Sequence, residues 1–364
     1  MTDSPLCQPS NEMHFTETHK TESFNAWNPE ITAQIDALVR LAKTSDSGHA
    51  DISDLVREMI VTALKAQHSG LSRADAKILS RSMRELRYGF RVFQPYQDRP
   101  KVTIFGSART RTHDMEYKQA RAFARKMVKA GFMVITGAGP GIMQAGNQGA
   151  GPENSFGVNI RLPYEQSTNP WVDKNDRYID CRFFFTRKLM FVREANAVAL
   201  FPGGFGTHDE GMEVLTLVQT GKADPMPIVM VDSPNGGYWK EWDSYVRKHF
   251  LKKGKVAEED FNLFKITDSI SNAVEEITNF YHNYHSLRYV KDRLVIRVQR
   301  AVPPEELDSL NERFKDILLK EARFTMGAPL PEEKEHPHLP RLLFGFNRVN
   351  YGRLRQVIDA LNKY

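Results

Sequence analysis

The spacing of apolar residues predicts a helical region at the start of the chain. Between residues 28 and 100, apolar side chains such as Ile31, Ile35 and Leu38 recur every three or four positions, which is typical of amphipathic helices. Helices are expected at residues 29–42, 52–67 and from Ser72 onward. The Ser72 hydroxyl is placed to cap the third of these helices. The sequence therefore predicts a helical extension over residues 28–100, preceded by a polar, aperiodic tail over residues 1–27.

From residue 101 the spacing of apolar residues changes, and short continuous apolar runs alternate with helical patterns. Buried strands are expected at residues 102–105, 132–136, 156–160, 178–182, 197–201 and 228–231. This alternation is typical of βαβ units and hence of a parallel sheet covered by helices on both faces. We therefore predict an α/β, Rossmann-like, doubly wound domain over residues 101–285. Such sheets bind ligands at the carboxyl ends of their strands, where this chain carries its glycine-rich segments.

The pattern of apolar residues changes again after residue 285. Strands are expected at residues 294–298, 323–325 and 342–346, helices at residues 303–319 and 351–361, and a polar, proline-rich loop at residues 329–340. This βαββα order predicts a small C-terminal α/β module over residues 286–364 rather than a continuation of the parallel sheet.

Composition narrows the class of protein. The 364 residues are 41% hydrophobic and 26% charged, which excludes a wholly disordered or low-complexity chain. No apolar run is long enough to cross a membrane, and the polar first 20 residues lack the features of a secretory signal. Two cysteines, Cys7 and Cys181, cannot form a disulfide framework or a cysteine-rich zinc site. We expect a soluble, cytoplasmic protein with no membrane partner.

Positive charge is concentrated in one part of the chain. The net charge is only +5, yet residues 71–130 carry 15 Lys and Arg against five Asp and Glu, a local excess of +10. The plainest interpretation is a solvated helix face. The alternative is an anionic partner, either a nucleotide-like ligand or, less favoured, nucleic acid.

Candidate chemistry centres on residues 202–210, with the sequence PGGFGTHDE. The segment follows the expected strand at residues 197–201 and precedes a helix expected at residues 212–219. The glycines Gly203, Gly204 and Gly206 allow the backbone to approach a ligand closely, and free amides at a helix N-terminus form an anion site. Thr207 adds a hydroxyl and Glu210 a carboxylate. This pattern favours a binding site for a nucleoside monophosphate over the structural alternative, a simple capped turn between strand and helix.

Two other segments end strands of the same sheet. One holds Gly137, Gly139 and Gly141, and the other is Gly106 followed by Ser107. The first lacks the G-x-G-x-x-G spacing of a dinucleotide site, and no phosphate-binding P-loop motif occurs in the chain. We predict that both segments form further walls of the phosphate or ribose site.

Basic residues complete the pattern. Arg187 and Lys188 begin the helix before the strand at residues 197–201, and Arg193 follows. Arginine can bind a phosphate or carboxylate with two hydrogen bonds, and lysine supplies a point charge. With the segment that ends at Glu210, these residues resemble the LOG ("lonely guy") family of nucleoside 5′-monophosphate phosphoribohydrolases, also labelled "lysine decarboxylase-like".

The resemblance covers residues 101–281 and implies an activity. It implies hydrolysis of the N-glycosidic bond of a purine or pyrimidine nucleoside 5′-monophosphate, such as AMP, to a free base and ribose 5-phosphate. It places the catalytic roles on Arg187 and Glu210, and substrate binding on Lys188 and the glycine-loop residues Gly203, Gly204, Gly206 and Thr207. It also implies a homodimer or a multiple of dimers, with no metal or organic cofactor.

Three features depart from the compact family pattern. Ala138 stands where a third consecutive glycine is usual, and His208 stands where related loops often carry an apolar residue. The terminal extensions resemble those of longer bacterial nucleotide nucleosidases, which implies a possible regulatory nucleotide. A non-catalytic nucleotide or molybdenum-cofactor carrier stays open as the alternative function. The pairs His282–His285 and His336–His338 lack a third ligand at metal spacing, so no metal site is expected.

Overall fold

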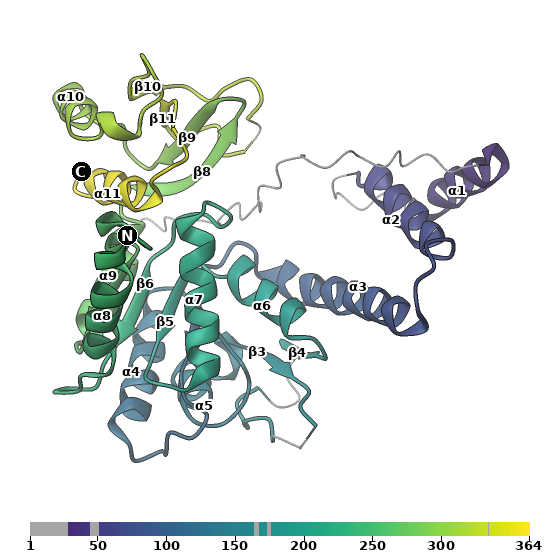
Figure 1. Ribbon diagram of the computed structural model, residues 1–364, viewed down its shortest axis with the longest axis horizontal. Coiled ribbons are helices and arrows are strands. Elements are labelled where there is room, and N and C mark those ends of the chain that lie inside the picture. Colours follow the sequence, from purple (N-terminus) through teal and green to yellow (C-terminus); the bar gives the residue numbers. More distant parts are fainter. Residues whose placement is uncertain (1–27, 44–50, 164–166, 173–175, 334) are drawn as a thin grey trace. The chain divides into compact units, whose positions relative to one another are not determined.

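The computed structural model describes residues 28–43, 51–163, 167–172, 176–333 and 335–364 of the chain. These residues fall into two compact units, one ending at Arg84 and the other extending from Glu85 to Tyr364. Figure 1 shows the N-terminal helices, a sheet flanked by helices and a second, smaller sheet. The predicted tail at residues 1–27 lies outside the described residues, as do residues 44–50 between the first two predicted helices.

Three helices occupy the predicted helical extension. They are α1 (Pro29–Ala42), α2 (Ser53–Ala66) and α3 (Arg73–Phe93). α1 and α2 are joined by an ion pair in which Arg57 Nε lies 2.8 Å from Asp36 Oδ1. The Ser72 hydroxyl accepts a hydrogen bond from the Asp75 amide at 3.1 Å, so the predicted cap of the third helix is confirmed.

The larger unit is built on a seven-stranded parallel sheet in the order β4-β3-β2-β1-β5-β6-β7. Its strands are β1 (Lys101–Phe105), β2 (Met133–Thr136), β3 (Ser155–Ile160), β4 (Tyr178–Cys181), β5 (Ala197–Leu200), β6 (Ile228–Val231) and β7 (Phe264–Thr267). Its helices are α4 (Met115–Lys129), α5 (Ile142–Ala150), α6 (Phe184–Arg193), α7 (Phe205–Gln219), α8 (Tyr238–His249) and α9 (Ile270–Phe280). The predicted α/β, doubly wound fold is confirmed.

Alternate residues of the central strands enter opposite hydrophobic cores. In β5, Ala197 and Ala199 belong to the core that α4 and α9 cover, whereas Val198 and Leu200 belong to the core that α6, α7 and α8 cover. Because successive side chains of a strand point to opposite faces, a strand covered on both faces must be apolar throughout. This double burial explains why the strands could be recognised as continuous apolar runs.

The strand order creates one point at which a ligand crevice is expected. The chain builds outward from β1 to β4 on one side, then returns to place β5, β6 and β7 on the other side. β1 and β5 are therefore neighbours, and the connections that follow them leave the sheet in opposite directions. At such a switch point a crevice opens beyond the carboxyl ends of the strands.

A four-stranded antiparallel sheet in the order β10-β11-β9-β8 follows. Its elements are β8 (Tyr284–Val290), β9 (Arg293–Val298), α10 (Pro304–Arg313), β10 (Thr325–Gly327), β11 (Arg341–Phe344) and α11 (Tyr351–Leu361). Leu294 and Ile296 of β9 and Val357 of α11 share one hydrophobic core with Phe280 of α9. The module therefore packs directly against the helices of the parallel sheet, within the same compact unit.

Several predicted elements need correction. β8 was not predicted, because its sequence YHSLRYV mixes polar and apolar residues without regular alternation, so the order is ββαββα rather than βαββα. β7 was also missed, since this four-residue edge strand is only partly buried. The helix predicted over residues 303–319 ends at Arg313 and is followed by a separate 3₁₀ turn, Lys315–Ile317.

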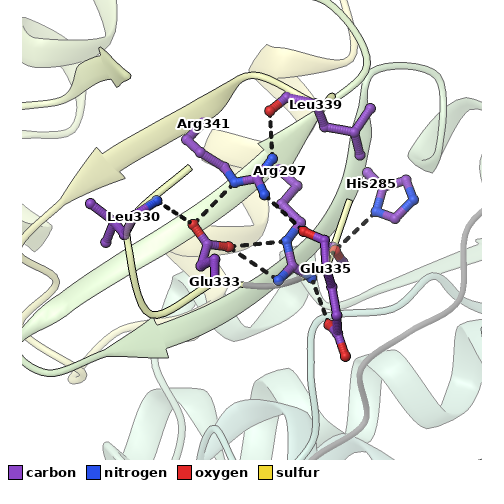
Figure 2. A network of polar contacts seen from close by, with 8 residues as sticks. His285, Arg297, Leu330, Glu333, Glu335, Leu339 and Arg341 are labelled. Carbon is purple, nitrogen blue, oxygen red and sulfur yellow. Dashed lines mark hydrogen bonds and ion pairs between the residues drawn. The ribbon is translucent and has the colours of Figure 1, made fainter. Parts of the chain in front are cut away.

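A buried ionic network joins the strands of the C-terminal sheet (Figure 2). Arg297 of β9 and Arg341 of β11 are direct cross-strand partners, and both side chains are almost completely buried. Glu333 lies between them, with Oε1 3.1 Å from Arg297 Nη2 and Oε2 3.1 Å from Arg341 Nε. Both arginines are thus balanced chiefly by one carboxylate from the proline-rich segment.

Two predictions from composition concern membranes and cysteines. In the described part of the chain, no helix is both long and apolar enough to span a membrane. Cys181 is a buried free thiol, and Cys7 lies outside the described residues. Burial raises the pKa of the Cys181 thiol to about 12, so this thiol is protonated at neutral pH and is a poor nucleophile.

Candidate functional site

A cleft of about 730 Å³ lies beyond the carboxyl ends of β1, β2 and β5. Nine of the residues predicted to form the site line it: Gly106, Ser107, Gly137, Arg187, Gly203, Gly204, Gly206, Thr207 and Glu210. The residues come from four separate segments of the sequence. The parallel topology brings these segments together because the carboxyl ends of adjacent parallel strands meet at one edge of the sheet.

The glycine loop after β5 runs directly into α7, which begins at Phe205 rather than at the predicted residue 212. Gly206 and Thr207 therefore lie in the first helical turn, and Glu210 lies in the second. Gly204 is the N-cap, and its carbonyl accepts hydrogen bonds from the Thr207 and His208 amides at 3.0 and 3.2 Å. The amides of Gly204, Phe205 and Gly206 precede this first bonded turn and are therefore the ones left for a ligand. The N-terminal end of α7 thus offers the cleft a partial positive charge and hydrogen-bond donors for an anion.

Gly203 is required by close contacts within the loop. A Cβ atom at this position would lie 2.1 Å from Thr207 Oγ1 and 2.9 Å from the Ser107 amide nitrogen. The Ser107 amide also donates a hydrogen bond of 3.1 Å to the Pro202 carbonyl. The loops after β1 and β5 are therefore pressed together, which holds the glycine loop in place.

Arg187 projects from α6 into the cleft and is fixed on three sides. Its Nε donates a 2.9 Å hydrogen bond to the Val158 carbonyl, and its guanidinium lies 4.8 Å from the centre of the Phe191 ring. A Cβ at Gly137 would lie 2.3 Å from Arg187 Nη2, so only glycine leaves room for the guanidinium. Arg187 is thus preorganised before any ligand binds.

Glu210 lies beside Arg187 and is nearly buried. Its Oε1 is 3.9 Å from Arg187 Nη1, and its side chain is 7% exposed. Burial raises the pKa of Glu210 to about 7, although the positive charges of Arg187 and Lys188 act in the opposite direction. A carboxylate with a pKa near neutrality can both accept and release a proton under physiological conditions.

Lys188 is not among the residues that line the cleft. Its Nζ lies 2.9 Å from Asp209 Oδ1 and 2.5 Å from Glu213 Oε2, so two carboxylates of α7 hold it. Its role in substrate binding stays a prediction. In this geometry Lys188 ties α6 to α7 and so supports the relative placement of Arg187 and Glu210.

The second glycine loop contributes Gly137 to the cleft, whereas Gly139 and Gly141 do not line it. Gly141 has a φ of +67°, and a Cβ there would lie 2.3 Å from the Ser107 carbonyl oxygen. Ala138 also has a positive φ, +64°, a backbone conformation that favours glycine. The family's third glycine would fit this conformation without strain. Gly139 and Gly141 therefore shape the loop beneath the cleft.

Sequence reasoning missed Asn169, which is buried and holds this second loop. Its side chain donates hydrogen bonds to the Gly139 carbonyl at 3.1 Å and to Asn147 Oδ1 at 3.0 Å. Its backbone amide donates to the Ala138 carbonyl at 2.8 Å. The polar residue falls in a segment with no periodic pattern, so the sequence carried no signal for it.

The sequence analysis also did not predict one wall of the cleft or the exposed cation Arg109. The wall consists of apolar side chains from four elements or their ends: Phe105, Met143, Ile160, Leu162 and Phe184. Arg109, two residues after Ser107, is exposed and lines the cleft as well. Arg109 is one of the basic residues between positions 71 and 130 whose excess indicated an anionic partner, but the excess did not single it out. The cleft thus combines an apolar side with an anion-binding side.

Two histidines of the pairs singled out in the sequence lie close together. His285 and His336 approach each other, with 4.4 Å between ring centroids. Across the described residues, however, no cluster of three or more His, Cys, Asp and Glu side chains is arranged to hold a metal ion. Burial next to His336 and Arg297 lowers the pKa of His285 to about 3, which keeps this ring neutral.

Comparison with known families finds a match in the central part of the chain. Residues 137–277 match the family described as "Possible lysine decarboxylase", which is the family that the sequence resembles. The resemblance is therefore confirmed over these residues. No lysine is found among the described residues that line the cleft. No curated protein matches the chain.

Solved structures with a similar arrangement have low sequence identity. The molybdenum cofactor binding protein of Rippkaea orientalis is 18% identical, with a TM-score of 0.36 over 50% of this chain and 96% of that chain. The molybdenum cofactor carrier protein of Chlamydomonas reinhardtii is 16% identical, with a TM-score of 0.35 over 50% and 96%. DNA processing protein A of Helicobacter pylori is 16% identical, with a TM-score of 0.35 over 51% and 83%.

Proposed function

We propose that this chain, whose residues 137–277 match the family described as "Possible lysine decarboxylase", hydrolyses the N-glycosidic bond of nucleoside 5′-monophosphates. The observation that carries the proposal is the pairing of nearly buried Glu210 with Arg187 beside a glycine loop that opens a helix. A simple anion carrier needs the loop but not a carboxylate whose pKa is about 7.

The two sides of the cleft suit the two ends of a nucleotide. The phosphate would bind to the amides of Gly204 and Gly206, to the Thr207 hydroxyl and to Arg109, since helix N-termini and arginines favour anions. The base would lie against the apolar wall that includes Met143 and Ile160. The ribose then falls between them, next to Glu210.

Glu210 would act on the ribose and on water. Breaking an N-glycosidic bond develops positive charge at C1′, and a nearby carboxylate stabilises that charge. Ionised Glu210 would also accept a proton from the attacking water, so that the water oxygen bonds to C1′ as the C1′–N bond breaks. The departing base would take up a proton from solvent, and Glu210 would release its proton to solvent, which restores the ionised carboxylate. Arg187 would position Glu210 and lower the pKa that burial raises. The products are the free base and ribose 5-phosphate.

The direct test is product release from a panel of nucleoside monophosphates, measured by chromatography. The wild-type protein is expected to release base and ribose 5-phosphate, and Arg187→Ala is expected to lower kcat/KM by about 10²–10³-fold. If monophosphates bind without being cleaved, the alternative carrier function replaces the proposal. If none binds, the phosphate site itself is wrong.

A second prediction concerns pH. Because ionised Glu210 is the active form and its pKa is about 7, the rate should rise with pH through that value. A pH profile of kcat/KM should fall about tenfold per unit below about pH 6 and level off above about pH 8. Lys188→Met should move the inflection to higher pH, since Lys188 helps to lower this pKa. A flat profile from pH 6 to 8 in the wild type contradicts the assignment.

Other expectations stay predictions. From the resemblance they are the homodimer or multiple of dimers and a regulatory nucleotide. From composition and apolar pattern they are a cytoplasmic location and the domain boundaries at residues 27, 100 and 285.

A further inference from the structure

A chain of hydrogen bonds reaches the glycine loop from behind the cleft. His208 of α7 lines the cleft, and its Nε2 lies 2.7 Å from the hydroxyl oxygen of Tyr238, the first residue of α8. The Tyr238 hydroxyl in turn donates a hydrogen bond to the carbonyl oxygen of Gly203. Tyr238 does not line the cleft. The proposed activity assigns no role to either side chain.

The protons of this chain can be assigned from its chemistry. A phenol has one proton, and here that proton is donated to the Gly203 carbonyl. The oxygen of Tyr238 must therefore accept a hydrogen bond from His208, which fixes a proton on Nε2. Burial lowers the pKa of His208, so the ring is neutral at pH 7 and its Nδ1 carries a lone pair.

This chain also fixes the direction of one backbone amide. In a planar trans peptide, the carbonyl and the following N–H point in opposite directions. Because the Gly203 carbonyl points toward Tyr238, the Gly204 N–H points away from Tyr238. Gly204 lines the cleft, and a Cβ at this position would meet no atom within 4 Å. An anion bound next to Gly204 in the cleft would therefore have room to approach this amide.

We propose that His208 and Tyr238 are positioning residues that hold the Gly203–Gly204 peptide with its amide directed at the phosphate of the ligand. The inference rests on the phosphate site of the proposed function, but not on hydrolysis. Because glycine has few steric restrictions, a peptide between two glycines can take more than one orientation unless a hydrogen bond holds it. Fixing one of these peptides in advance removes part of the entropic cost of binding an anion.

A purely structural role makes a different prediction. The ring of His208 also packs against Trp239, with 5.5 Å between centroids, and Tyr238 packs against the same indole at 4.9 Å. Tyr238→Phe keeps this packing and removes only the hydroxyl. If packing alone matters, this variant should bind every ligand as the wild type does.

The experiment measures binding of inorganic phosphate and of adenosine by calorimetry, together with the kinetics of AMP cleavage. Tyr238→Phe is expected to weaken phosphate binding and raise KM for AMP by about tenfold, with kcat within about threefold, because one charge-assisted hydrogen bond loses its alignment. Affinity for adenosine, which lacks the phosphate, should not change. Tyr245→Phe, on the exposed side of α8, is the matched control and should leave all three quantities unchanged.

Substitution of His208 provides a rescue test. His208→Gln keeps a side-chain N–H that can donate to Tyr238, so it should retain phosphate affinity within about threefold. His208→Leu removes the donor and should weaken phosphate binding toward the level of Tyr238→Phe. Equal affinities in the Gln and Leu variants contradict a role for the hydrogen bond.

The outcomes separate the two proposals. If AMP is cleaved and Tyr238→Phe leaves KM and phosphate affinity unchanged, the positioning role is wrong and the proposed function stands. If AMP is not cleaved but Tyr238→Phe weakens phosphate binding, the proposed function fails and the positioning role stands. If the wild-type protein binds neither phosphate nor AMP, both are overturned.

Discussion

Replacement of Glu210 by glutamine is expected to lower kcat for nucleoside monophosphate hydrolysis by about 10³-fold while changing nucleotide affinity by less than about tenfold. Glutamine keeps the size of the side chain and its contact with Arg187, but it cannot accept a proton from water or carry the negative charge that stabilises C1′. The loss should therefore appear in kcat rather than in binding. Single-turnover kinetics together with calorimetric titration of the nucleotide separate these two quantities.

The matched control is Glu213→Gln, which neutralises a carboxylate three residues further along α7. Glu213 does not line the cleft and pairs with Lys188 instead, so kcat should stay within about fivefold of the wild type. Equal losses in the two variants would indicate a general effect of charge on α7. Full activity of Glu210→Gln would remove Glu210 from the mechanism.

The sequence was sufficient to predict the cleft because its main features depend on topology. Gly106, Gly137 and Gly203 each follow a buried strand, and parallel strands that alternate with helices must bring such ends to one edge. Arg187 and Glu210 are 23 residues apart in sequence, yet α6, β5 and α7 return them to the same crevice. Local patterns and one topological rule are enough for this part of the site.

The apolar wall and the supports of the loops could not be predicted in the same way. Met143, Leu162 and Phe184 look like ordinary core residues in sequence, and only the tertiary fold leaves them facing a cleft. Asn169 acts through hydrogen bonds to backbone carbonyls, which depend on atomic positions rather than on any spacing. Such contacts become visible only when the distant segments are placed together.

The start of α7 shows a limit of helix-start signals. Gly204 and Gly206 favour a loop by intrinsic propensity, so the helix was predicted to begin only at residue 212. In the structure the N-terminal turn forms through these glycines, anchored by the contacts of Gly203 with Thr207 and with Ser107. The consequence is functional, because the earlier start directs the first free amides of the helix into the cleft.

The second large effect expected is on stability, and it concerns the buried network of the C-terminal sheet (Figure 2). Glu333→Gln should lower the free energy of unfolding by about 3–5 kcal/mol, because it leaves Arg297 and Arg341 buried without their shared counter-charge. Their side chains are 1% and 0% exposed, and they are direct cross-strand partners, so their repulsion is poorly screened. Urea denaturation, followed by circular dichroism, measures the change.

Three further observations would distinguish loss of this charge from a general disturbance of the segment. Glu335→Gln is the matched control, since Glu335 is 61% exposed and 3.5 Å from Arg297. This substitution should lower the free energy of unfolding by less than about 1 kcal/mol.

Adding Arg341→Met to Glu333→Gln should restore part of the lost stability, because it removes one of the two unbalanced charges. Burial alone would raise the pKa of Glu333, but the hydrogen bonds and charges of its partners lower it, so its contribution should be lost only as the pH falls below about 4.5. A Glu333→Gln variant as stable as Glu335→Gln at pH 7 would mean that this carboxylate does not hold the two strands together.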